Sequence, residues 1–90
     1  MKIIDQDGQW YGSIAVARLT GISLRQLYYW VDGLHIVQPQ VRQHGRRRFR
    51  HFTARDVRTI NRMRELVETG YTLATARRMA GDEAEGTRHG

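Results

Sequence analysis

Residues 16–30 have the sequence VARLTGISLRQLYYW, which contains the end of one helix, a turn and most of a second helix. Ser13 is expected to cap the first helix, and Gly21 to end it. Ser23 then begins the second helix, because a serine three residues before Gln26 forms a capping box that satisfies the backbone amides of both residues. Two short helices separated by the residues GIS have the spacing of a helix-turn-helix.

The second helix, which Gly33 is expected to close, has a clear apolar side. At about 100° per residue, Leu24, Leu27 and Val31 fall on one face and are predicted to be buried. Tyr28 and Trp30 lie on the flanks, where an aromatic ring packs while its polar edge stays hydrated, so we expect both to be structural. On the first helix, the predicted apolar side consists of Val16, Ala17 and Leu19.

The opposite face of the second helix is polar and aromatic. Arg25 and Tyr29 are four residues apart and project together, with Gln26 beside them. An exposed tyrosine hydroxyl next to arginine and glutamine suits contacts to phosphates and to base edges. This face is therefore predicted to read nucleic acid.

Length and composition restrict the function classes. Ninety residues suggest one small domain with open surfaces rather than a deep catalytic cavity. There is no cysteine, so disulfides and thiolate metal sites are excluded. The four histidines lack the i, i+4 spacing that brings two onto one metal, and no apolar run is long enough to cross a bilayer. We expect no metal, no cofactor and no membrane association, and a cytosolic, nucleoid-associated location.

The charge is positive and concentrated. The formal net charge is +6, and fourteen of the fifteen basic residues are arginine. Residues 34–52 contain a turn candidate at His44-Gly45 followed by RRRFRHF, which predicts a two-stranded hairpin with Phe49 and Phe52 packed inward. Arginine suits bidentate contact with phosphate and guanine. Five arginines lie within nine residues of this hairpin: Arg42, Arg46, Arg47, Arg48 and Arg50.

The rest of the chain is predicted to be helical. Thr53 begins a third helix with Asp56 as its capping partner, and Gly70 ends it. Thr72 caps a fourth helix that ends at Ala80. The expected apolar positions of these helices are Val57, Ile60, Met63, Leu66, Val67, Leu73, Ala76 and Met79, with Arg77 and Arg78 pointing outward. We therefore expect a leader over 1–12, one domain over 13–80 and a disordered tail over 81–90.

Four segments resemble the DNA-binding domain of the MerR-type winged helix-turn-helix proteins. VARLTGIS (16–23) is similar to the first helix and turn, and RQLYYW (25–30) to the recognition helix. FRHFTARDV (49–57) resembles the second wing strand and the start of the third helix. LVETGYTLATARRM (66–79) is similar to the end of that domain. The four matches occur in the family's order and cover about residues 11 to 80.

This resemblance implies a mainly α fold, a winged helix-turn-helix with four short helices and a two-stranded hairpin as the wing. It implies that the second helix enters the major groove and that Arg50 is the wing's phosphate contact. Arg48 replaces the glycine usual before the wing aromatic, which suggests deeper backbone or minor-groove contact. The complete candidate DNA-binding set is Arg18, Ser23, Arg25, Gln26, Tyr29, Arg42, Arg46, Arg47, Arg48 and Arg50.

The segment after residue 80 helps to distinguish between possible functions. Regulators of this family continue into a dimerising helix and an effector- or metal-sensing domain, whereas ten polar residues remain here. We expect an architectural, excisionase-like protein (a recombination directionality factor) that binds adjacent duplex sites cooperatively, self-associates head to tail on DNA and bends it. The alternative is a MerR-type transcriptional regulator or a fragment of one, and a third reading is a protein- or RNA-binding module. A recombinase or RNA polymerase is the expected protein partner.

No enzyme is predicted, because the chain contains no histidine–carboxylate–nucleophile constellation and no phosphate-binding loop.

Overall fold

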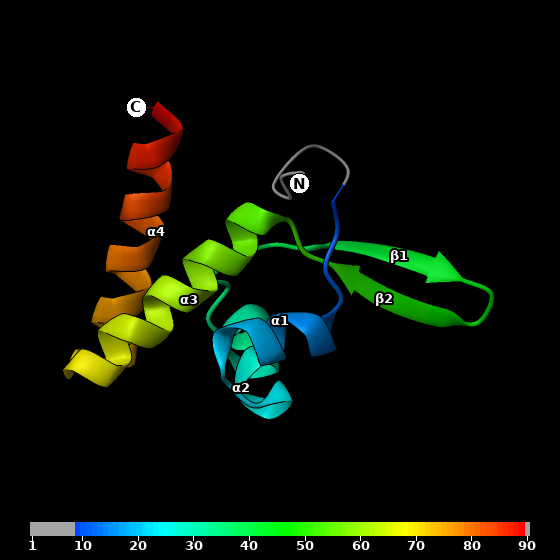
Figure 1. Ribbon diagram of the computed structural model, residues 1–90, viewed down its shortest axis with the longest axis horizontal. Coiled ribbons are helices and arrows are strands. Elements are labelled where there is room, and N and C mark those ends of the chain that lie inside the picture. Colours follow the sequence, from blue (N-terminus) through cyan, green and yellow to red (C-terminus); the bar gives the residue numbers. More distant parts are fainter. Residues whose placement is uncertain (1–8, 90) are drawn as a thin grey trace.

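The computed structural model describes residues 9–89, with side chains through residue 86. Of the leader expected over 1–12, residues 1–8 lie outside this range, as does residue 90 at the other end. The helices gather on one side and the hairpin projects away from them (Figure 1). This is the expected mainly α, winged helix-turn-helix fold. In chain order the elements are α1 (Ser13–Thr20), α2 (Leu24–Tyr28), the π-helical η1 (Tyr29–Gly33), β1 (Gln40–His44), β2 (Arg47–His51), α3 (Ala54–Thr69) and α4 (Leu73–His89).

α1 differs from its prediction at both its start and its buried face. Its N-cap is Gly12, without a side-chain cap, rather than Ser13. Leu19, expected in the core, is 59% exposed, and Thr20 is buried in its place. The Thr20 hydroxyl donates a 2.7 Å hydrogen bond to the Val16 carbonyl, which removes the cost of burying that polar group. The helix ends as predicted at Gly21, whose φ of 78° is the left-handed conformation that glycine adopts without strain.

The second helix begins as predicted and ends in an unpredicted π turn. The Ser23 side chain accepts a hydrogen bond from the Gln26 amide at 3.0 Å, which is one half of the expected capping box. The amide of Leu34 donates to the Tyr29 carbonyl at 3.0 Å, the i to i+5 bond of a π-helix. Leu27 and Val31 are buried as predicted, whereas Leu24 is exposed. Trp30, expected on a flank with its polar edge hydrated, is fully buried.

One hydrophobic core joins all the helices to the base of the hairpin. Trp30 and Phe52 are its largest fully buried side chains, and Val16, Leu27, Ile60 and Met63 complete the set with less than 2% exposure. Burial of side chains this large contributes about 1.5–3 kcal/mol each, so this cluster is what fixes α1, α2 and α3 relative to one another.

The hairpin is short and solvated. β1 and β2 are antiparallel, with Gln40 opposite His51 and His44 opposite Arg47. Tyr11 and Phe52 extend the base of the hairpin by an isolated bridge with two backbone hydrogen bonds of 2.8 and 2.9 Å. Phe52 is fully buried as predicted, but Phe49 is 41% exposed, because the projecting hairpin has no core beneath that position.

α3 has the predicted N-terminal cap, and α4 is longer than predicted. Thr53 and Asp56 form a reciprocal capping box, with both hydrogen bonds at 3.1 Å. The Thr72 hydroxyl accepts from the Thr75 amide at 3.2 Å. The disordered tail predicted over 81–90 is wrong for residues 81–89, because α4 continues through them.

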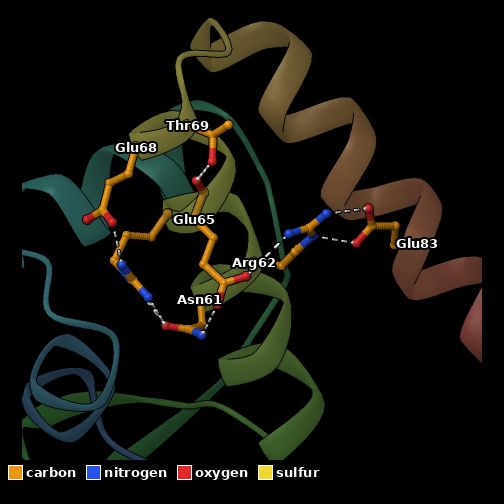
Figure 2. A network of polar contacts seen from close by, with 7 residues as sticks. Asn61, Arg62, Glu65, Glu68, Thr69 and Glu83 are labelled. Carbon is orange, nitrogen blue, oxygen red and sulfur yellow. Dashed lines mark hydrogen bonds and ion pairs between the residues drawn. The ribbon is translucent and has the colours of Figure 1, made fainter.

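An ion pair joins α3 to the additional turns of α4. Arg62 donates to both carboxylate oxygens of Glu83, at 2.8 and 3.3 Å, and to Glu65 at 3.3 Å. Figure 2 shows Arg62 between these two glutamates. The hydrogen bond to Glu83, more than that to Glu65, raises the pKa of Arg62 above its usual value. The buried Ala80 packs at the same helix pair, so Gly81 lies inside a supported helix instead of ending one.

Candidate nucleic-acid interface

The polar face of α2 is exposed as the sequence analysis predicted. Arg25 is exposed, Gln26 is half-buried, and Tyr29 is 52% exposed at the start of η1. They project together because Leu27 and Trp30 hold the other side of the helix in the core. This face offers a guanidinium, an amide and a phenol hydroxyl, which are groups that contact base edges and phosphates.

Two further candidate residues, Arg18 and Ser23, come before α2 in the chain. Arg18 is exposed in the last turn of α1. Ser23 is exposed, but its hydroxyl already caps α2 by accepting from the Gln26 amide. The same hydroxyl can also donate a hydrogen bond, so Ser23 can cap α2 and contact a phosphate at the same time.

The ring of Tyr29 rests against Gly33. A Cβ atom added at Gly33 would lie 2.9 Å from Cδ1 and 3.1 Å from Cε1 of Tyr29, closer than side chains pack. Glycine at this position therefore leaves room for the aromatic ring of Tyr29. Gly33 was predicted only as a helix stop, and its contact with Tyr29 follows from the π turn.

Arg50 connects the wing to the recognition helix. Its guanidinium donates to Asp32 of η1 at 2.7 Å, and its Cζ lies 4.7 Å from the ring centroid of Tyr28. Tyr28 is 37% exposed, so it is less buried than predicted and serves as a platform for this arginine. Asp32 was not among the predicted site residues, although it is the last carboxylate that precedes the arginine-rich hairpin in the sequence.

The strand register divides four of the five hairpin arginines between two faces. Residues opposite one another share a face, and successive residues along a strand point to opposite faces. Arg48 and Arg50 therefore share the face of Val41, which lines a groove with the end of η1. Arg42 and Arg47 lie on the other face, and Arg46 lies in the turn between the strands. All are exposed except Arg50, which is half-buried.

A side chain of α4 forms hydrogen bonds with the backbone of the segment between η1 and the wing. Arg77 donates to the carbonyls of Leu34 and His35, at 2.7 and 3.2 Å. His35 has a φ of 56°, an uncommon left-handed conformation for a residue other than glycine. Arg77 was predicted only to point outward, and these contacts show that it also stabilises the path from the recognition helix to the hairpin.

Other classes of site find little support in the described part of the chain. Among the described side chains, those of residues 9–86, no group of three or more histidines, aspartates and glutamates could hold a metal ion. Within the same residues, no helix is long and apolar enough to cross a membrane.

The fold and its exposed basic surface define a winged helix-turn-helix protein. Residues 12–83 match the MerR HTH family regulatory protein family, so the chain belongs to that family. This match begins and ends within three residues of the resemblance drawn from the four sequence segments. A search of curated proteins gave no match to this chain.

Proposed function

We propose that the protein binds double-stranded DNA, with α2 in the major groove and the wing on the flanking backbone. The observation that carries the proposal is the junction made by Arg50, Asp32 and Tyr28, which joins the polar face of α2 to one face of the wing. Because these contacts show that the two surfaces adjoin, both can contact adjacent parts of one duplex. Arg25, Gln26 and Tyr29 are the base-reading candidates, and Arg46, Arg48 and Arg50 are the phosphate-contacting ones.

Charge supports a nucleic-acid partner. From residue 33 to residue 55 the sequence contains no aspartate or glutamate, so nothing in the wing itself offsets its arginines. Neutralising a phosphate releases condensed counterions, and each such contact adds about −0.9 to the log–log slope of affinity against salt. Duplex binding should therefore weaken steeply with salt.

The biological role that best fits the family is regulation of transcription. Membership in a family of regulatory proteins favours the regulator alternative over the excisionase-like role. Neither the fold nor the comparison supports recombination or DNA bending. Cooperative occupation of adjacent sites is a finer hypothesis for the same DNA-binding surface.

Footprinting over the DNA that flanks the protein's own gene tests this role. A regulator protects a promoter, whereas a recombination directionality factor protects an attachment site. The same duplex, titrated at increasing salt, should lose affinity by orders of magnitude. Affinity that hardly changes between low and moderate salt would contradict a phosphate-contacting wing.

A further inference from the structure

The face of the wing that points away from Arg48 and Arg50 carries a continuous group of rings. The ring of Trp10 lies 5.7 Å from that of His51, measured between centroids. His51 stacks on His44 at 6.2 Å, and His44 meets the edge of Phe49 at 5.5 Å. His44, Phe49 and His51 thus adjoin one another on a two-stranded ribbon that has no core of its own, and Trp10 joins them from the segment before α1.

Two arginines accompany these rings. The Cζ atoms of Arg42 and Arg47 lie 5.9 Å from the ring centroids of Trp10 and Phe49, respectively. Both arginines are exposed. We call the surface formed by Trp10, Arg42, His44, Arg47, Phe49 and His51 the aromatic face of the wing.

The strand register places the hairpin side chains of the aromatic face on the other side of the ribbon from the surface proposed to contact duplex DNA, although Phe49 also lines the groove beside Val41 and Arg50. In the strand register, Arg42 is opposite Phe49 and His44 is opposite Arg47, so these four side chains share one side of the ribbon. Val41 and Arg50 are opposite one another on the other side, which Arg50 fastens to Asp32. A duplex seated on α2 and that other side leaves the aromatic face exposed to solvent.

We propose that the aromatic face binds single-stranded nucleic acid. Unpaired bases stack on aromatic side chains, and cationic side chains beside the rings follow the phosphates. Phe49 is 41% exposed, and Trp10 and His51 are half-buried, so the rings retain surface for stacking. Bases within a duplex already stack on each other and do not offer their faces, so this surface selects an unpaired strand.

The charge of the aromatic face favours a nucleic acid over a protein as its binding partner. An apolar protein partner needs a contiguous apolar surface, whereas the rings here alternate with Arg42, Arg47 and two histidines. Together with the absence of carboxylates from residue 33 to residue 55, this composition matches a polyanion with aromatic groups.

Trp10 supplies the readout. The chain has two tryptophans, and Trp30 is 1% exposed in the core, so fluorescence quenching by a stacked base reports Trp10. We expect short oligothymidine to quench this fluorescence at low salt, and oligouridine in a parallel titration to show whether the site distinguishes DNA from RNA. A blunt duplex of equal length should quench less.

The matched variants are Phe49→Ala on the aromatic face and Val41→Ala on the opposite face of the same hairpin, where Val41 is 50% exposed. Loss of one stacked base should weaken oligothymidine binding of Phe49→Ala by about 5- to 150-fold, whereas Val41→Ala should bind as wild type does. Arg42→Ala, which removes a charge and no ring, should also weaken binding and provides a second test if Phe49→Ala does not fold.

Three results would overturn the proposal: no quenching by either oligonucleotide, equal losses in Phe49→Ala and Val41→Ala, or stronger binding by the duplex at this face. Failure here is distinguishable from failure of the duplex proposal. Gln26→Ala should impair recognition of a specific duplex and leave oligothymidine binding unchanged.

Discussion

Gln26 and Arg48 occupy different positions on the proposed duplex surface, so alanine substitutions at the two positions should affect duplex binding differently. Gln26 projects from α2, where an amide can pair with a base edge, whereas Arg48 is an exposed wing residue suited to phosphate. Gln26→Ala should cost about 1–3 kcal/mol on the cognate duplex and little on a scrambled one. Arg48→Ala should weaken both equally. Gel shifts on the two duplexes measure this, and equal losses from Gln26→Ala on both would refute the base-reading role.

Asp32 competes with DNA for the guanidinium of Arg50. The carboxylate holds that group at 2.7 Å, and a negative charge beside the proposed interface also repels phosphate. Asp32→Asn removes the charge and keeps the shape, so we expect higher duplex affinity and a steeper salt slope, by about one phosphate contact. Fluorescence anisotropy across a salt series provides the measurement. Lower affinity in this variant would mean that Asp32 orients Arg50 for binding instead of competing for it.

At the scale of the elements, the π turn at the end of α2 sets the orientation of Tyr29. A methyl group at Gly33 would collide with that ring, so Gly33→Ala should displace Tyr29 and weaken duplex binding while the fold persists. Gly81→Ala is the matched control, because its Cβ atom would meet nothing within 4 Å. That control should stabilise α4 by about 0.5–1 kcal/mol and leave binding unchanged. Thermal unfolding and duplex titration of both variants test this, and wild-type affinity in Gly33→Ala would contradict the assigned role of Tyr29.

Local chemistry predicted the element boundaries better than it predicted burial. Gly21, Thr53 and Gly70 each determine a helix end through their own side chain or backbone, so sequence rules located those ends. Leu19 and Phe49 are apolar, yet both are exposed, because burial depends on what another element places above them. A helical period identifies a face of α1, but the position of α3 decides which residues of that face are covered.

Sequence rules predicted which residues of α2 lie on its exposed face, but they did not predict how that face adjoins the wing. The outward face of α2 follows from helical periodicity, which is local. The junction of Arg50 with Asp32 spans eighteen positions, and the contact of Arg62 with Glu83 spans twenty-one. Such pairs depend on tertiary placement. The second contact lies in the part of α4 after Ala80, which is helical although its composition indicated disorder.

One small domain makes few contacts with DNA, so it needs a way to gain affinity for its sites. We expect the free protein to be mostly monomeric and to fill adjacent duplex sites cooperatively, because linked contacts along one DNA raise the effective concentration of the next copy. Pairing of the acidic residues after Ala80 with the basic surface of a neighbouring copy would be one route to such an array. Glu83 already pairs with Arg62 in its own chain, so that route must compete with an existing contact.

Sedimentation of the free protein, together with gel shifts on one, two and three adjacent sites, tests the array. Cooperative filling with altered DNA mobility is the expected result. If sites are bent, the cost of about 1–6 kcal/mol per site of 20–30 bp must be offset by the added contacts. A stable dimer in solution, or independent filling with unchanged mobility, would exclude this arrangement.

Chemical-shift mapping by NMR with a duplex footprinted from the flanking DNA tests the central claim most directly. The account predicts that amide shifts concentrate in Arg25–Tyr29 of the recognition helix and in Arg46–Arg50 of the wing. The outer surface of α4 around Arg78 should be unaffected. Shifts centred on α3 and α4, with the recognition helix unchanged, would contradict it.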